Sequence, residues 1–215
     1  MMHAKMPLID KKIIITRAQE QISEAHEIFK RNGAEVFDLP SLIIGPPDNW
    51  SPLDDALKQI YTFDWIIFSS ANGVRNVEER MNQIDLSLSK ISKTIKIAAV
   101  GRKTASLLSD MDARISFVPP SFVADSLIEN FPQNQKGLKL LIPRVQTGGR
   151  SILSDSFKSN GAEVTELAAY ESSCPEFIPQ LTIDALNSRK IDIIAFTSSK
   201  TVINTVILFK KYFGE

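Results

Sequence analysis

The sequence has 215 residues, with Lys+Arg and Asp+Glu equal at 25 each. That balance gives no electrostatic signature of a protein that binds nucleic acid or an anionic membrane. The only cysteine is Cys174, which excludes an internal disulfide and a thiolate-rich metal site. The only histidines are His3 and His26, which leaves almost no residues for a histidine-based metal cluster or a Ser-His-Asp triad. We therefore expect no metal site, and no nucleic acid or membrane partner. Because the N-terminus also lacks a signal-peptide pattern, we expect a cytoplasmic protein.

An internal repeat organises the chain. Residues 29–36 and 157–164 are identical at seven of eight positions, and residues 64–70 resemble residues 192–198. Both pairs are separated by the same offset, 128 residues, from 29 to 157 and from 64 to 192. A constant offset in separate segments indicates two copies of one unit.

The repeated unit alternates strands and helices. In the first copy, apolar runs predict strands at 12–17, 36–39, 65–69, 95–100 and 115–118, and helical spacing predicts helices at 19–32, from 51 onward, at 73–81 and at 104–109. In the second copy we expect strands at 139–142, 164–167 and 191–197, and helices at 152–160, 181–187 and 202–213. The strands lack polar alternation, which is typical of parallel sheets covered on both faces. The sequence predicts an α/β fold of two flavodoxin-like, three-layer domains.

The second copy ends earlier than the first. Adding the offset of 128 to Ile97 and Phe117 places their counterparts near 225 and 245, whereas the sequence given ends at Glu215. We therefore expect a C-terminally short chain whose first domain lacks its last two strand–helix units. We also expect the strand at 191–197 to be an uncovered edge, and this truncated chain to have little activity alone.

Three polar loops follow predicted strands, at residues 69–73, 101–105 and 197–201. In parallel α/β sheets ligands bind at the carboxyl ends of strands, where helix N-termini present free N–H groups. Hydroxyls and backbone donors there suit carboxylates or phosphates, and Arg17 and Arg144 end the first strand of each copy. Each feature also has a plain structural explanation: helix capping for the serines and threonines, a tight turn for Gly101, and solvation for the two arginines.

Four segments together resemble the uroporphyrinogen-III synthase family. They are, in order, Phe68–Val74, Ala99–Ala105, Leu167–Tyr170 and Phe196–Val202. The resemblance covers essentially Lys12 to Phe213. It implies two domains, residues 1–40 with 172–215 and residues 41–171, joined by a two-stranded linker, with the active site in the cleft between them.

The resemblance also implies an activity. The family cyclises hydroxymethylbilane, a linear tetrapyrrole octacarboxylate, with inversion of the last pyrrole ring and loss of water, in haem, chlorophyll and corrin biosynthesis. It implies a cofactor-independent hydro-lyase that is a monomer and makes a transient contact with the preceding enzyme of the pathway. The alternative is a non-enzymatic two-domain ligand-binding or regulatory protein on the same fold.

The motifs assign roles to particular residues. Tyr170 matches the family's favoured proton donor, although a tyrosine that packs at a hinge is the alternative. The expected substrate-binding residues lie in the polar loops and at the strand ends: Arg17, Ser69, Ser70, Ala71, Asn72, Gly101, Lys103, Thr104, Arg144, Thr197, Ser198 and Ser199.

Overall fold

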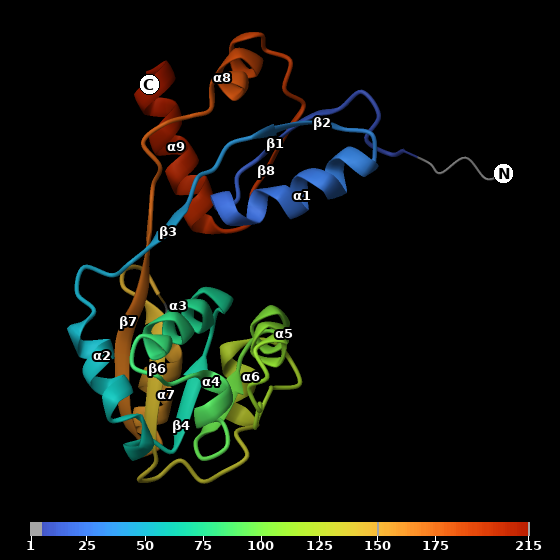
Figure 1. Cartoon of the computed structure of the whole chain (residues 1–215). Helices are drawn as coiled ribbons and strands as arrows, with labels where there is room; N and C mark the ends of the chain where they lie inside the picture. The colour runs from blue at the N-terminus through green and yellow to red at the C-terminus, as the bar shows by residue number, and fades with distance from the viewer. Residues whose placement is uncertain (1–5, 150, 215) are drawn as a thin grey trace, which may run out of the picture. The chain divides into compact units, whose positions relative to one another are not determined.

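The computed structural model describes residues 6–149 and 151–214. Two compact units make up the chain, one of residues 1–44 and 172–215 and the other of residues 45–171. Both are α/β units with parallel strand pairs, as the sequence predicts (Figure 1). The first division between the units falls after Ile44, inside strand β3 (Ile43–Gly45), which pairs in the sheet of the second unit.

The first unit is built on a three-stranded parallel sheet of order β2-β1-β8. Its elements are, in chain order, β1 (Lys12–Ile15), α1 (Gln19–Arg31), β2 (Glu35–Asp38), α8 (Gln180–Asn187), β8 (Ile193–Ala195) and α9 (Ser199–Phe213). Successive side chains of a strand point to opposite faces. Ile14 accordingly packs with Leu39, Ile178 and Leu208 on the face that α8 and α9 cover. The buried Ile13 and Ile15 point to the other face, along which α1 lies (Figure 1).

The second unit is built on a five-stranded sheet of order β3-β7-β6-β4-β5. Its remaining elements are α2 (Ser51–Lys58), the 3₁₀ turn η1 (Ile60–Thr62), β4 (Trp65–Phe68), α3 (Ala71–Asn82), α4 (Leu88–Ile91), β5 (Lys96–Ala99), α5 (Arg102–Asp110), α6 (Ala124–Glu129), β6 (Lys139–Val145), α7 (Ile152–Ser159) and β7 (Glu163–Ser173). All four residues of β4 are buried, because helices cover both faces of the sheet. Trp65 and Ile67 pack with Leu127 of α6 and Phe157 of α7, whereas α3 and α5 contact each other over the opposite face.

The two sheets repeat one strand order. In the first unit, the first two strands of copy one stand beside β8 of copy two, in the order β2-β1-β8. In the second unit, the first two strands of copy two stand beside β4 and β5 of copy one, in the order β7-β6-β4-β5. Each unit therefore combines the beginning of one copy with the end of the other. Among the described residues β8 is an edge strand, whereas its counterpart β4 has neighbours on both sides.

Several predicted elements differ from the structure. The strand predicted at 115–118 is wrong: Phe117 makes only an isolated bridge to Ala98, and two prolines, Pro119 and Pro120, follow before the ladder can extend. β7 runs through the expected crossing to Ser173, because β3 pairs along it. Strand β3 and the short helices α4 and α6 were not predicted. No helix in the part of the chain that the structure describes is long and apolar enough to cross a membrane.

Candidate functional site

The loop after β4 begins the candidate site in the second unit. Ser70 has extended backbone and is the N-cap of α3, where the Gly73 N–H donates to Ser70 Oγ at 3.0 Å. A Cβ at Gly73 would lie 3.4 Å from Ser70 Oγ and 3.6 Å from the Pro143 carbonyl oxygen, which is ordinary van der Waals contact, so it is the Gly73 N–H that matters at this position. This contact fixes the Ser70 hydroxyl at the carboxyl end of the sheet.

Tyr170 brings a phenol to the same hydroxyl. It lies near the end of β7, it is 9% exposed, and its hydroxyl oxygen is 3.1 Å from Ser70 Oγ. A register irregularity places Val145 opposite Tyr170 although Arg144 pairs with Ala168, so one extra residue turns β7 just before the tyrosine. The contact joins β7 to the loop that follows β4, although β6 lies between these two strands in the sheet.

The environment of Tyr170 favours the neutral phenol. Burial raises the pKa of Tyr170 above its ordinary value of 10.0, and the charge of Glu171 adds to that effect. The Ser70 hydrogen bond and the positive charge of Arg144 act in the opposite direction and lower the pKa. Tyr170 consequently holds its proton at neutral pH. Groups that stabilise a phenolate already stand beside it.

Arg144 is engaged by an acidic partner that the sequence analysis did not consider. Its Nη1 donates to Glu166 Oε1 at 2.6 Å, and both side chains are about one fifth exposed. Arg144 pairs in register with Ala168, and Glu166 lies two residues before Ala168, on the same face of β7. The alternation of side chains along the strand could therefore have predicted this ion pair. Arg144, which was expected to bind a carboxylate of a ligand or to be solvated, is thus paired with a carboxylate of the protein through one of the five N–H donors of its guanidinium.

The other predicted residues of the second unit have different surroundings. Ser69 and Lys103 are exposed, and Ala71 and Asn72 are half-buried in the first turn of α3. Gly101 is the N-cap of α5 with a φ of −113°, and a Cβ there would meet only Thr104 Oγ1 at 3.7 Å, so neither backbone nor space demands glycine. Thr104 is 3% exposed and packs inward.

The first unit carries its own polar loop. Ser198 caps α9 in a capping box, accepting from the Thr201 N–H at 3.3 Å while Thr201 Oγ1 accepts from the Ser198 N–H at 3.2 Å. Thr197, Ser198 and Ser199 are exposed there. Arg17 stands 3.9 Å from Glu24. At the position equivalent to Tyr170, 128 residues earlier, this unit has Leu42.

Comparisons with known proteins agree on one family. Residues 23–214 match the family model of uroporphyrinogen-III synthase HemD. The uroporphyrinogen-III synthase of Synechococcus elongatus is 44% identical over 211 residues, which are 98% of this chain and 79% of that protein. The chain belongs to the uroporphyrinogen-III synthase family. Its fold matches a mutant uroporphyrinogen III synthase from Thermus thermophilus with a TM-score of 0.64 at 17% identity, covering 93% of this chain and 76% of that one. It also matches the enzyme of Helicobacter pylori with a TM-score of 0.54 at 16% identity, covering 93% and 78%.

The structure brings together only some of the residues expected to form the site of a uroporphyrinogen-III synthase. It places the hydroxyls of Ser70 and Tyr170 in contact, with the Arg144 charge close enough to act on the phenol. Thr104 faces the core. Within the described residues no group of three or more His, Cys, Asp or Glu side chains could hold a metal ion.

Proposed function

We propose that this chain is a cofactor-independent hydro-lyase of the cytoplasm that converts hydroxymethylbilane into uroporphyrinogen III. The observation that carries the proposal is the 44% identity to a uroporphyrinogen-III synthase across 98% of the chain. The Tyr170–Ser70 contact supports it, because a buried, neutral acid stands among hydroxyl and backbone donors. Nothing in the comparisons favours a non-enzymatic ligand-binding protein.

The reaction needs a proton for its leaving group. Tyr170 gives its proton to the terminal hydroxyl oxygen of the substrate, the carbon–oxygen bond breaks, and water departs. The pyrrole nitrogen supplies the electron pair, which leaves an azafulvenium cation beside the Tyr170 phenolate. A phenol is a weak acid at neutral pH, so the reactivity of the substrate itself provides most of the driving force.

The phenolate that remains needs stabilisation. Ser70 Oγ accepts from the Gly73 N–H, and its own hydrogen is therefore available to donate to the Tyr170 oxygen. Arg144 adds a positive charge that favours the phenolate. The azafulvenium carbon bonds first to the substituted α-carbon of the last pyrrole ring and gives a spiro intermediate. The older bond from that carbon to its methylene bridge then breaks, and the freed methylene bonds to the other α-carbon of the same ring. That carbon loses its proton, which restores the phenol.

Binding of the eight carboxylates requires many donors. We propose that the exposed loop residues Ser69, Lys103, Thr197, Ser198 and Ser199 contribute, together with Arg17 and the half-buried Ala71, Asn72 and Gly101 through their backbone or side chains. Arg144 acts on the substrate while held by Glu166, and Thr104 supports the first turn of α5. We further propose that the protein acts as a monomer and contacts the preceding enzyme of the pathway transiently.

The product isomer tests the function. Hydroxymethylbilane closes without an enzyme to the type I isomer, whereas a synthase gives type III. Incubation with rising concentrations of the protein should therefore raise the type III fraction in proportion to catalyst. A type I product at every concentration would overturn the proposal.

A further inference from the structure

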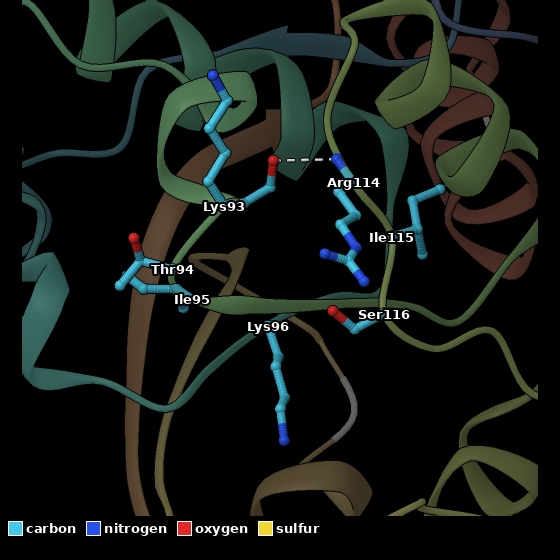
Figure 2. A pocket seen from close by; sticks show the side chains of 8 residues that line it. Lys93, Thr94, Ile95, Lys96, Arg114, Ile115 and Ser116 are labelled. Carbon is cyan, nitrogen blue, oxygen red and sulfur yellow. Dashed lines mark hydrogen bonds between the residues drawn. The ribbon is translucent and has the colours of Figure 1, made fainter.

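The second unit has a cavity that the proposed function does not use. It has a volume of about 380 Å³ and is lined by two segments, residues 92–96 before and at the start of β5 and residues 114–116 (Figure 2). Hydrogen bonds hold the segments together: the Arg114 N–H donates to Ser92 Oγ at 3.0 Å, and the Ser116 N–H donates to the Ile97 carbonyl at 2.8 Å. A pocket of this size lies in the range that binds small molecules.

The charge around the cavity is of one sign. Lys93, Lys96 and Arg114 line it, and none of the eight lining residues is acidic. Figure 2 shows the Arg114 guanidinium directed into the hollow, while the Lys93 and Lys96 side chains extend away from it in opposite directions. The hydroxyls of Thr94 and Ser116 also belong to the lining.

Lys93, Lys96 and Arg114 have no ion-pair partner among the described residues. Lys96 Nζ donates to Gln133 Oε1 at 2.8 Å and lies 5.3 Å from the Trp65 ring centre, and both of these partners are uncharged. The Asp64 carboxylate, which lies at the same end of the sheet, accepts a hydrogen bond from the Lys139 N–H instead. Among the described residues, neither Lys93 nor Arg114 has an acidic side chain within ion-pair distance.

A nearby helix end does not account for the cluster. Helix C-termini attract cations, but α4 has only four residues, and the N–H groups of Thr94 and Ile95 already donate to the Ile91 carbonyl. The guanidinium of Arg114, which Figure 2 shows directed into the hollow, carries five N–H donors in a fork that suits an oxyanion.

The cavity is separate from the candidate active site. It lies where β5 begins, whereas Gly101 and Ser70 follow the ends of β5 and β4. Because β5 is four residues long, its two ends lie roughly 10 Å apart.

We infer that this cavity binds a phosphate group, free or carried by a small molecule, with Arg114 as its principal ligand and Lys93 and Lys96 as flanking charges. A phosphate dianion accepts from the arginine fork and from a hydroxyl of the lining, and the two lysines add positive potential around it. The site would make the protein sensitive to a phosphorylated ligand that is unrelated to the tetrapyrrole.

Amide NMR spectra of the protein, titrated with inorganic phosphate at constant ionic strength, test the site. We expect saturable shifts confined to the amides of residues 92–97 and 114–117. The variant Arg114→Gln should weaken the affinity at least about tenfold and Lys93→Gln about threefold, because a charge-assisted bidentate contact is the stronger. Lys158→Gln, which removes a charge from the exposed surface of α7, should leave the affinity unchanged.

Two further arms separate the outcomes. A small phosphomonoester that binds more tightly than inorganic phosphate assigns the site to a phosphorylated metabolite, and equal affinity assigns it to the free ion. Equal shifts with chloride, or shifts that survive Arg114→Gln, would mean diffuse surface charge and would overturn the inference. Because no tetrapyrrole is present, the result stands or falls independently of the proposed synthase activity.

Discussion

The two units carry the same strand–loop–helix segment but differ at a residue beside it. Ser70 and Ser198 both cap the helix that follows the third strand of the repeat. In the second unit the Tyr170 hydroxyl contacts Ser70, whereas the first unit has Leu42 at the equivalent position. The duplicated segment thus has the same strand, loop and helix cap in both units, and the tyrosine in only one of them.

The units also differ in how this segment is covered. Val74 of α3 is fully buried, while its counterpart Val202 of α9 is 40% exposed. β4 lies between β6 and β5, whereas β8 pairs only with β1 among the described strands. The same residue type at equivalent positions therefore has two different environments, which allows matched substitutions.

The largest expected effect comes from Tyr170→Phe. We expect kcat to fall about a hundredfold, the range of a lost general acid, while KM stays within about twofold because the carboxylate contacts remain. Steady-state kinetics with hydroxymethylbilane measure both constants. Tyr61→Phe, at an exposed tyrosine of η1, is the matched control and should change neither. An unaltered kcat in Tyr170→Phe would make Tyr170 a packing residue.

The buried and exposed valines should differ in stability. Val74→Ala should lower the free energy of opening of α3 by about 2 kcal/mol, because a fully buried side chain is truncated. Val202→Ala should cost α9 less than about 0.5 kcal/mol. Amide hydrogen exchange of the two helices reports both values. Equal losses would show that α9 is covered in solution.

The two caps should be equivalent for stability and different for activity. Ser70→Ala and Ser198→Ala each remove a side-chain acceptor at a helix N-terminus and should each cost about 1 kcal/mol. Only Ser70→Ala should also lower kcat, since it removes the partner of Tyr170. Thermal melting and the isomer assay on the same preparations make the comparison. A similar loss of kcat in Ser198→Ala would contradict the division of roles.

The smallest effect concerns alkaline pH. Because burial raises the pKa of Tyr170 in the folded protein, the stability that this group contributes is fully present below its unfolded pKa near 10 and is lost as the pH rises through the folded value. Above pH 10 the wild-type protein should therefore lose stability more steeply than Tyr170→Phe. Urea denaturation midpoints between pH 8 and 11 provide the curves, and parallel curves would indicate an unperturbed phenol.

The repeat in the sequence was sufficient to predict the α/β class, the parallel sheets and the equivalence of the two helix caps. It could not predict the length of β7, because the pairing with β3 is a long-range contact. It also misassigned 115–118, where the apolar residues pack without a ladder. An apolar pattern indicates that residues are buried, but a strand also needs an adjacent strand with which its backbone can pair.

The candidate site was predictable as a set of residues and less so as a geometry. Ser70 and Tyr170 could each be named from motifs, but their contact depends on the irregularity between Arg144 and Val145, for which the sequence has no marker. The Glu166 partner of Arg144 was overlooked, because a charge at a strand end was judged without its neighbour on the adjacent strand. Roles for these residues stay predictions until they are substituted.

A double-mutant cycle of Tyr170 and Ser70 on kcat tests most directly whether these two side chains act as one unit at the carboxyl end of the second sheet. The cycle compares Tyr170→Phe, Ser70→Ala and the double variant with the wild type, each measured on folded protein by formation of the type III isomer. We expect the double variant to be no slower than Tyr170→Phe, because Ser70 acts through the phenol. Independent losses that multiply in the double variant would contradict it.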